Sequence, residues 1–134
     1  LITSTDATTW TSQTSGFGTT AIRTLAYGNG IYLAGGTNGY LTTSTDAVTW
    51  TTRTSGIGGT LLSSIYANGV YLMGSSTGYL ISSTDAVTWT PYYIAGGSPI
   101  YSLTYSGNAY VAAYPNYIYS STDGIIETIG GILI

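Results

Sequence analysis

Between residues 22 and 53 the chain alternates short apolar runs with turns that contain Gly and Asn. Residues 22–27 (Ile-Arg-Thr-Leu-Ala-Tyr) and 31–34 (Ile-Tyr-Leu-Ala) are rich in strand-forming side chains. The Asn29-Gly30 pair between them is a strong signal for a two-residue hairpin turn. A third strand is predicted at 40–44, after a second turn, and a short fourth strand begins at residue 50. The segment therefore predicts four short antiparallel strands, because no stretch keeps a helical period.

The same order of strands and turns returns twice further along the chain. Four short strands in every 38 to 40 residues are typical of a β-propeller blade. A β-sandwich is the main competing fold, but its strands need not repeat in sequence at every fourth strand. We therefore predict an all-β fold, a β-propeller of four-stranded antiparallel blades. The matching strands are expected at 61–66, 70–73, 79–83 and from 89, and then at 100–105, 109–113 and 117–121.

The chain is predicted to form one domain of about three and a half blades. Leu1 aligns with Leu41 and Leu80, so the chain begins inside a third strand. Propellers close with about four to eight blades, and we expect either identical chains or a longer parent chain to close the ring. The simplest closed form is a dimer of about six to seven blades, in which the N-terminal half-blade completes the last blade of its partner. The predicted parts are a half-blade at 1–13, blades at 20–53, 59–90 and 98–128, the last one decayed, and an apolar tail at 129–134.

An eight-residue segment, here called the box, leads from each predicted third strand into the fourth. It reads Ser-Thr-Asp-Ala-Val-Thr-Trp-Thr at 44–51 and 83–90, with an earlier copy at 4–11 and an altered one at 121–128. We predict that its aspartate closes the turn by accepting backbone hydrogen bonds. Its tryptophan is expected to pack between neighbouring sheets, in equivalent places in each repeat. These structural residues are Asp6, Asp46, Asp85 and Asp123, with Trp10, Trp50 and Trp89.

The box resembles the Asp-box, the hairpin motif of sialidase-type and related propellers. Ala stands in three copies where that motif usually has Gly. Residues 27–33 (Tyr-Gly-Asn-Gly-Ile-Tyr-Leu) are similar to repeats in phage tail and bacterial surface proteins. The resemblance covers nearly the whole chain and implies blade architecture. It also implies a place in a virion or on a cell surface, as a tail-associated component or an adhesin.

The composition argues against several classes of partner and cofactor. Only 5% of the residues are charged, the net charge is -3, and the sequence contains neither His nor Cys. Binding to nucleic acid or to an anionic membrane would need many cationic side chains, so neither is expected. No apolar run approaches the length that spans a bilayer. We expect no cofactor and no metal, because one Asp per repeat cannot supply the roughly six to eight oxygen ligands of a Ca²⁺ site.

The few remaining ionisable residues argue against catalysis. Glu127 is the only acid outside the Asp position of the box, and it stands where the other copies carry Trp. A glycosidase usually needs two carboxylates around one bond. The resemblance to sialidases would also require a cluster of arginines, which Arg23 and Arg53 cannot supply within one chain. We therefore predict a non-enzymatic binding or structural module.

Tyrosines are the candidate contact residues, because Tyr offers a large contact area at little cost in rotamer entropy. Those that recur in the repeats are expected to pack between blades. A second group crowds the last third of the chain and gives the weak candidates for ligand binding, Tyr92, Tyr93, Tyr101 and Tyr114. Two function classes stay open: a virion or surface module that binds a partner or host surface, and a glycan-binding lectin. A designed or reconstructed repeat protein is a third possibility.

Overall fold

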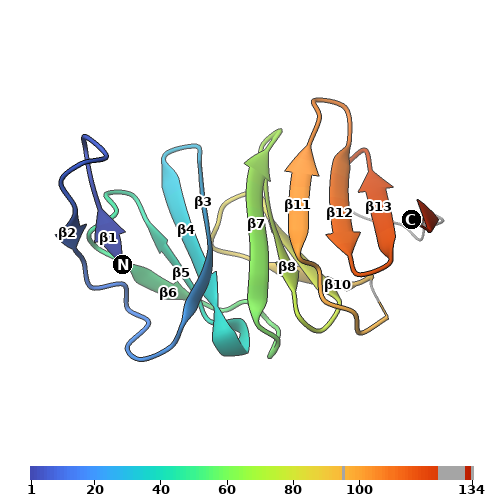
Figure 1. Ribbon diagram of the computed structural model, residues 1–134, viewed down its shortest axis with the longest axis horizontal. Helices are drawn as coiled ribbons and strands as arrows, with labels where there is room; N and C mark the ends of the chain where they lie inside the picture. Colours follow the sequence, from blue (N-terminus) through green and yellow to red (C-terminus); the bar gives the residue numbers. More distant parts are fainter. Residues whose placement is uncertain (95, 124–131, 134) are drawn as a thin grey trace.

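The computed structural model describes residues 1–94, 96–123 and 132–133. Its strands form one two-stranded sheet and three four-stranded antiparallel sheets, each made of strands that are consecutive in sequence. Figure 1 shows these sheets side by side along the long axis of the molecule. We call them, in chain order, the half-blade and the first, second and third blades. The helical structure of the described residues is a single short 3₁₀ turn, η1 (Thr37–Gly39).

The strands lie close to their predicted positions. The half-blade contains β1 (Ile2–Thr3) and β2 (Thr11–Ser12), and the first blade contains β3 (Ile22–Gly28), β4 (Ile31–Gly36), β5 (Leu41–Ser44) and β6 (Thr51–Arg53). The second blade contains β7 (Leu61–Ala67), β8 (Val70–Ser75), β9 (Tyr79–Ser83) and β10 (Thr90–Tyr93). The third blade contains β11 (Ser102–Tyr105), β12 (Tyr110–Tyr114), β13 (Tyr117–Ser121) and β14 (Ile132–Leu133).

Tight turns join the first two strands of the first and second blades. Asn29 and Gly30 have φ values of 47° and 78°, and Asn68 and Gly69 have φ values of 48° and 81°. A two-residue hairpin turn with positive φ at both central residues is of type I′, whose twist matches that of the flanking strands. The Asn-Gly pairs therefore set the register of β3 with β4 and of β7 with β8, as predicted.

The first strands of neighbouring blades face one another. β3 contacts β7, and β7 contacts β11. The hydroxyls of Thr24 and Ser64 lie 2.6 Å apart, and the Ser63 hydroxyl donates a hydrogen bond to the Ile100 carbonyl at 3.0 Å. At Gly28 an added Cβ would lie 2.0 Å from the ring of Tyr66, so only glycine permits this close approach between blades.

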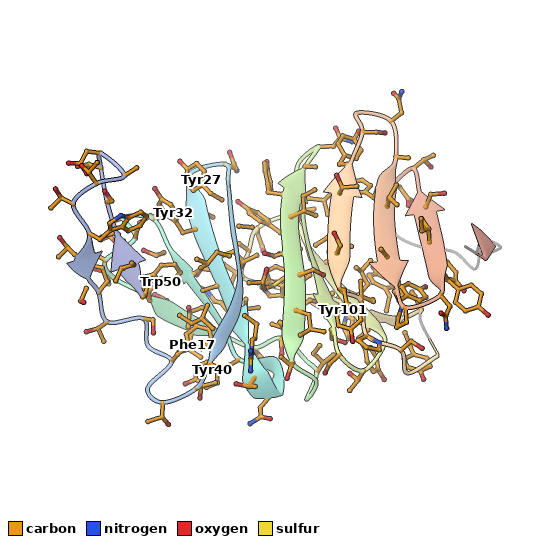
Figure 2. The ribbon with its side chains drawn as sticks, viewed as in Figure 1. Phe17, Tyr27, Tyr32, Tyr40, Trp50 and Tyr101 are labelled. Carbon is orange, nitrogen blue, oxygen red and sulfur yellow. The ribbon has the colours of Figure 1, made fainter. Side chains whose placement is uncertain are left out.

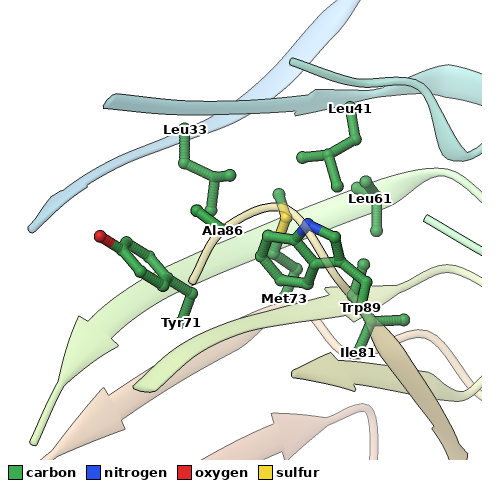
Figure 3. Close-up of a cluster of buried hydrophobic side chains, with 8 residues drawn as sticks. All are labelled: Leu33, Leu41, Leu61, Tyr71, Met73, Ile81, Ala86 and Trp89. Carbon is green, nitrogen blue, oxygen red and sulfur yellow. The ribbon is translucent and has the colours of Figure 1, made fainter. Parts of the chain in front are cut away.

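Two hydrophobic cores lie between the blades rather than inside one sheet. β8 contributes to both, because its successive side chains point to opposite faces of the sheet: Tyr71 and Met73 to one core, Leu72 to the other. The core between the first and second blades, drawn in Figure 3, contains Leu33, Leu41, Leu61, Tyr71, Met73, Ile81, Ala86 and Trp89. The core between the second and third blades contains Leu72, Leu80, Ile100, Tyr110, Ala112 and Tyr114.

The three box tryptophans differ in burial, although the sequence predicts equivalent places for them. Trp89 is 8% exposed, Trp50 is half-buried, and Trp10 is 54% exposed. Trp89 packs against the complete first blade, through residues such as Leu33 and Leu41. Trp50 faces the half-blade, which consists of two short strands, and Trp10 belongs to the half-blade itself. The prediction of inter-blade packing therefore differs from the structure at Trp10, because no described blade precedes it.

Two segments near the C-terminal end also differ from their predicted form. The second blade extends beyond its predicted end at residue 90, because β10 runs through Tyr93 and pairs with β9. Pro91 is tolerated there because β10 is an edge strand. The fourth box lies outside the described residues from position 124 onward. The fourth strand of the third blade is β14, in the predicted apolar tail, where Leu133 pairs with Tyr117 and Ile132 with Ile118.

Candidate functional site

The box aspartates accept several hydrogen bonds that close the box turn. In the first blade, Oδ1 of Asp46 accepts the backbone N–H of Thr49 at 2.7 Å, that of Val48 at 2.8 Å, and the Ser44 hydroxyl at 2.9 Å. Asp6 and Asp85 repeat this geometry. The backbone N–H groups hold the pKa of the Asp46 carboxyl well below its usual range, and they lower the pKa of Asp85 to about 2. These carboxylates are charged at neutral pH and have the turn-closing geometry expected of the box.

The residue after each of these aspartates is an alanine with left-handed backbone. The φ values are 60° at Ala7, 61° at Ala47 and 59° at Ala86. This conformation costs a residue with a Cβ about 1–2 kcal/mol relative to its right-handed form. The turn thus has the geometry that favours glycine, and the Asp hydrogen bonds hold alanine in it.

A polar crevice of about 160 Å³ lies between the boxes of the first and second blades. One wall comes from the first blade and includes Thr43, Ser44 and Arg53, and the other includes Asp85 and Val87. The half-buried Arg53 donates from Nε to the Thr43 hydroxyl at 2.9 Å. Within the described residues Arg53 makes no ion pair with a carboxylate. The crevice therefore combines guanidinium donors, a carboxylate acceptor and threonine hydroxyls.

The same crevice recurs between the half-blade and the first blade. Thr3, Gln13 and Asp46 take the places of Thr43, Arg53 and Asp85 in its lining. The Gln13 amide donates to the Thr3 hydroxyl at 3.0 Å, which matches the contact made by arginine in the next repeat. This crevice is larger, about 380 Å³, and lies next to the incomplete half-blade.

The residue at this lining position changes from repeat to repeat, while its neighbour with a side-chain hydroxyl is Thr3, Thr43 or Ser82. The β-strand register places Arg53 opposite Leu41 and Tyr92 opposite Leu80, so Tyr92 is the equivalent residue of the second blade. A variable position within a constant repeat is the sequence signal from which the crevices could have been inferred. The ligand contacts predicted from the sequence were instead all tyrosines.

The four candidate ligand tyrosines lie on three strands or strand ends. Tyr92 is half-buried on β10, and Tyr93 on the same strand is 60% exposed, with its ring centroid 5.0 Å from that of Tyr79. Tyr101, labelled in Figure 2, is 60% exposed just before β11. No ring contact among the described residues joins two of the four.

Tyr114 does not fit its predicted role as a ligand contact. It is buried at the end of β12, and its ring stacks on that of Tyr119 with centroids 4.8 Å apart. Burial raises the pKa of its phenol. Packing between strands explains this residue better than contact with a ligand.

The tyrosines that recur in the repeats are only in part packed between blades: Tyr71 and Tyr110 are buried there, whereas Tyr27, Tyr32, Tyr40 and Tyr117 are more than a third exposed. Each inner hairpin carries a pair of rings with centroids 4.5 Å apart, Tyr27 with Tyr32, Tyr66 with Tyr71, and Tyr105 with Tyr110. The buried second member donates its hydroxyl to a backbone carbonyl of the preceding blade, Tyr71 to Gly28 at 2.7 Å and Tyr110 to Ala67 at 2.6 Å. These bonds tie consecutive blades together at the same place in each repeat.

The first blade presents an open apolar face at the side where a preceding blade would lie. Its cavity of about 410 Å³ is lined by residues that include Trp10, Leu25, Tyr27, Tyr32 and Trp50. Leu25 and Tyr27 are more than half exposed, and Tyr32 is 37% exposed. Figure 2 labels Tyr27, Tyr32 and Trp50 on the side of the first blade next to the half-blade. The equivalent residues of the second blade are covered by the first blade.

The part of the chain that the structure describes contains no group of three or more acidic, His or Cys side chains that could hold a metal ion. It also contains no helix of the length and apolarity needed to span a bilayer.

Comparison with known proteins places the architecture. No family model and no curated protein sequence match the chain. Among solved structures, it is similar to the WD40 β-propeller domain of Doa1, with a TM-score of 0.63 and 15% identity over 79% of this chain. The fold is a β-propeller with an open ring. The chain spans 38% of the length of that Doa1 chain, so it corresponds to part of a propeller.

Two computationally designed proteins, Ika8 and Ika4, are also similar, each with a TM-score of 0.45 and 11% identity over 78% of this chain. The matches cover 46% and 92% of those chains. A TM-score of 0.45 is too low to relate the origin of this chain to that of the designed proteins.

Proposed function

We propose that the chain is a non-catalytic binding and structural module built from Asp-box-type propeller blades. Its expected setting is a virion, as a tail-associated component, or a cell surface, as an adhesin. The observation that carries the proposal is the use of the carboxylates: those of Asp6, Asp46 and Asp85 each bind two backbone N–H groups and a serine hydroxyl. A general acid must hold a proton near neutral pH, and the lowered pKa values of these groups work against that role.

The placement of the two arginines supports the same proposal. Arg23 lies on the inner strand β3, whereas Arg53 lies on the outer strand β6 of the same blade. They do not gather into the arginine cluster that the sialidase resemblance would require. Of the two remaining acids, Asp123 accepts the Ser121 hydroxyl at 2.8 Å, and Glu127 lies outside the described residues.

We also propose that further strands cover the open face of the first blade. The internal repeats indicate what is needed there, because Tyr71 and Tyr110 each donate to a carbonyl of the blade before them and Tyr32 has the equivalent position. An inner hairpin of a second copy of this chain, or further blades of a longer chain, would supply that carbonyl. The predicted pairing of the half-blade with a partner's last blade would need a free edge on β13, and β14 pairs with that edge.

A glycan-binding lectin is the second candidate function. The two polar crevices favour it, because each is lined by hydroxyl groups, an amide or guanidinium donor and a carboxylate acceptor. A sugar-binding site is therefore expected in the crevices between neighbouring boxes rather than at the predicted tyrosines.

Binding of the chain to a glycan array, to intact cells and to candidate surface proteins tests the proposal. Selective binding to one sugar class supports the lectin, and binding restricted to cells or to a protein supports the module. Reproducible turnover of a glycoside by protein purified to homogeneity would contradict both. Light scattering on the 134-residue chain measures self-association, and a stable monomer at micromolar concentration would leave further blades as the remaining source of closure.

A further inference from the structure

The charges in the crevice between the first and second boxes restrict its ligand. Arg53 and Asp85 line the same small volume without forming an ion pair. An anion bound beside Arg53 would also lie near the Asp85 carboxylate, which stays ionised, and a cation would lie near the guanidinium. The paired charges therefore favour a neutral polar ligand.

The hydrogen-bonding groups indicate a ligand that both donates and accepts. A guanidinium has five N–H donors, and the described contacts of Arg53 use only Nε, toward Thr43. A carboxylate has about four acceptor sites, and the Ser83 hydroxyl and the N–H groups of Val87 and Thr88 all reach Oδ1 of Asp85. Donor and acceptor capacity therefore remains on opposite walls. Adjacent hydroxyl groups of a polyol match such a pair, because each hydroxyl can accept from one wall and donate to the other.

The size of the crevice sets the size of the ligand. Its volume of about 160 Å³ is well below the roughly 300–1,000 Å³ of pockets that hold drug-sized molecules. Ile31 and Val87 add apolar surface to the lining, against which the C–H face of a ring could lie. Thr45 and Thr49 are exposed at its rim, so a longer molecule could continue into solvent.

We propose that this crevice binds one neutral sugar ring through a pair of adjacent hydroxyls, held between Arg53 and Asp85. The proposal rests on the binding function proposed above and names its site and ligand class. The crevice of the half-blade carries Gln13 in place of Arg53, and an amide lacks the charge that strengthens a hydrogen bond. The Arg53 crevice is therefore the tighter of the two.

Methyl glycosides of glucose, galactose and mannose are suitable probes, titrated into ¹⁵N-labelled full-length chain and followed by NMR. We expect saturable shifts of the Arg53 side-chain Nε–H and of the Val87 and Thr88 amides with at least one probe. Arg53→Ala should weaken binding about tenfold or more, equivalent to 1.4 kcal/mol. Arg23→Ala makes the same change of net charge at an exposed site outside the crevice and should leave affinity unchanged.

Arg53→Gln keeps the test decisive if the alanine variant fails to fold, because glutamine occupies the equivalent site at position 13 and donates to the equivalent threonine, Thr3. It should fold and bind less tightly than the parent chain. Absence of saturable shifts at the crevice with all three probes overturns the proposal. Glycan binding that Arg53→Ala or Arg53→Gln leaves intact also overturns it, while the chain would still be a binding module. Enzymatic turnover, in contrast, would remove the proposed function itself.

Discussion

Replacement of each box tryptophan by alanine, one at a time, tests whether burial between blades stabilises this propeller. Trp10, Trp50 and Trp89 have the same place in the same local motif but differ in exposure, at 54%, half-buried and 8%. The three variants therefore differ in how far a neighbouring blade covers the tryptophan, while the local sequence stays nearly constant. We expect the loss of unfolding free energy to rise from Trp10 through Trp50 to Trp89.

The expected magnitudes follow from buried area. A fully buried Trp removes about 150–250 Å² from water, worth about 4–6 kcal/mol at 25 cal/mol per Å², and measured Trp→Ala losses in cores are about 3–5 kcal/mol. Trp10 buries less than half as much, so its loss should stay at or below about 2 kcal/mol. The Trp89 indole N–H is buried and has no hydrogen-bond partner among the described residues, whereas Trp50 donates to the Ala47 carbonyl at 3.2 Å. Trp89→Phe should therefore cost much less than Trp89→Ala, because it removes an unpaired donor.

Urea denaturation followed by circular dichroism measures these losses, at a concentration where light scattering shows one association state for all variants. The Trp89→Ala loss should exceed that of Trp10→Ala by about 2 kcal/mol. Equal losses at the three positions, or a larger loss at Trp10, would refute burial by the preceding blade as the cause. A Trp10→Ala loss that grows with protein concentration would instead indicate that self-association covers this side chain.

Three further predictions concern single contacts. Tyr71→Phe should lower unfolding free energy by about 1 kcal/mol, because it leaves the Gly28 carbonyl without its hydroxyl donor, while Tyr32→Phe should change it little; equal effects in thermal melts would contradict this. Stability should fall between about pH 4 and pH 2, because the folded pKa of Asp85 is depressed to about 2 and its stabilising effect is lost as the pH drops through that value. A melting temperature that is constant through this window would be inconsistent with the lowered pKa. Ala47→Gly should raise the melting temperature, since left-handed backbone costs alanine about 1–2 kcal/mol and the added entropy of an unfolded glycine about 0.4–1; a lower melting temperature would show that the Ala47 methyl packs more tightly than its half-buried state indicates.

The sequence alone determined the blade architecture and much of the strand order. Its period, the Asn-Gly turns and the repeated box are local features, and hairpins and turns depend on residues that are near one another in sequence. For this reason the sequence alone predicted the bounds of β9 and β13. It also predicted tight hairpin turns at the Asn-Gly pairs. The fourth strand of the third blade could not be predicted in this way, because β14 pairs through the backbone and lies beyond the recognisable repeat.

Only the tertiary structure decided which equivalent residues are buried and which surfaces are hollow. Trp10 and Trp89 have almost the same neighbours in sequence, and their exposure differs because the first blade covers Trp89, while the described part of the chain contains no blade before Trp10. Tyr114 belongs to the same class of unrepeated tyrosine as the exposed Tyr93, yet it packs inside a core. The crevice between Arg53 and Asp85 joins residues from two blades, and no pattern within one repeat specifies the space between two sheets. Burial and cavities depend on how sheets pack, which is a property of the assembled blades.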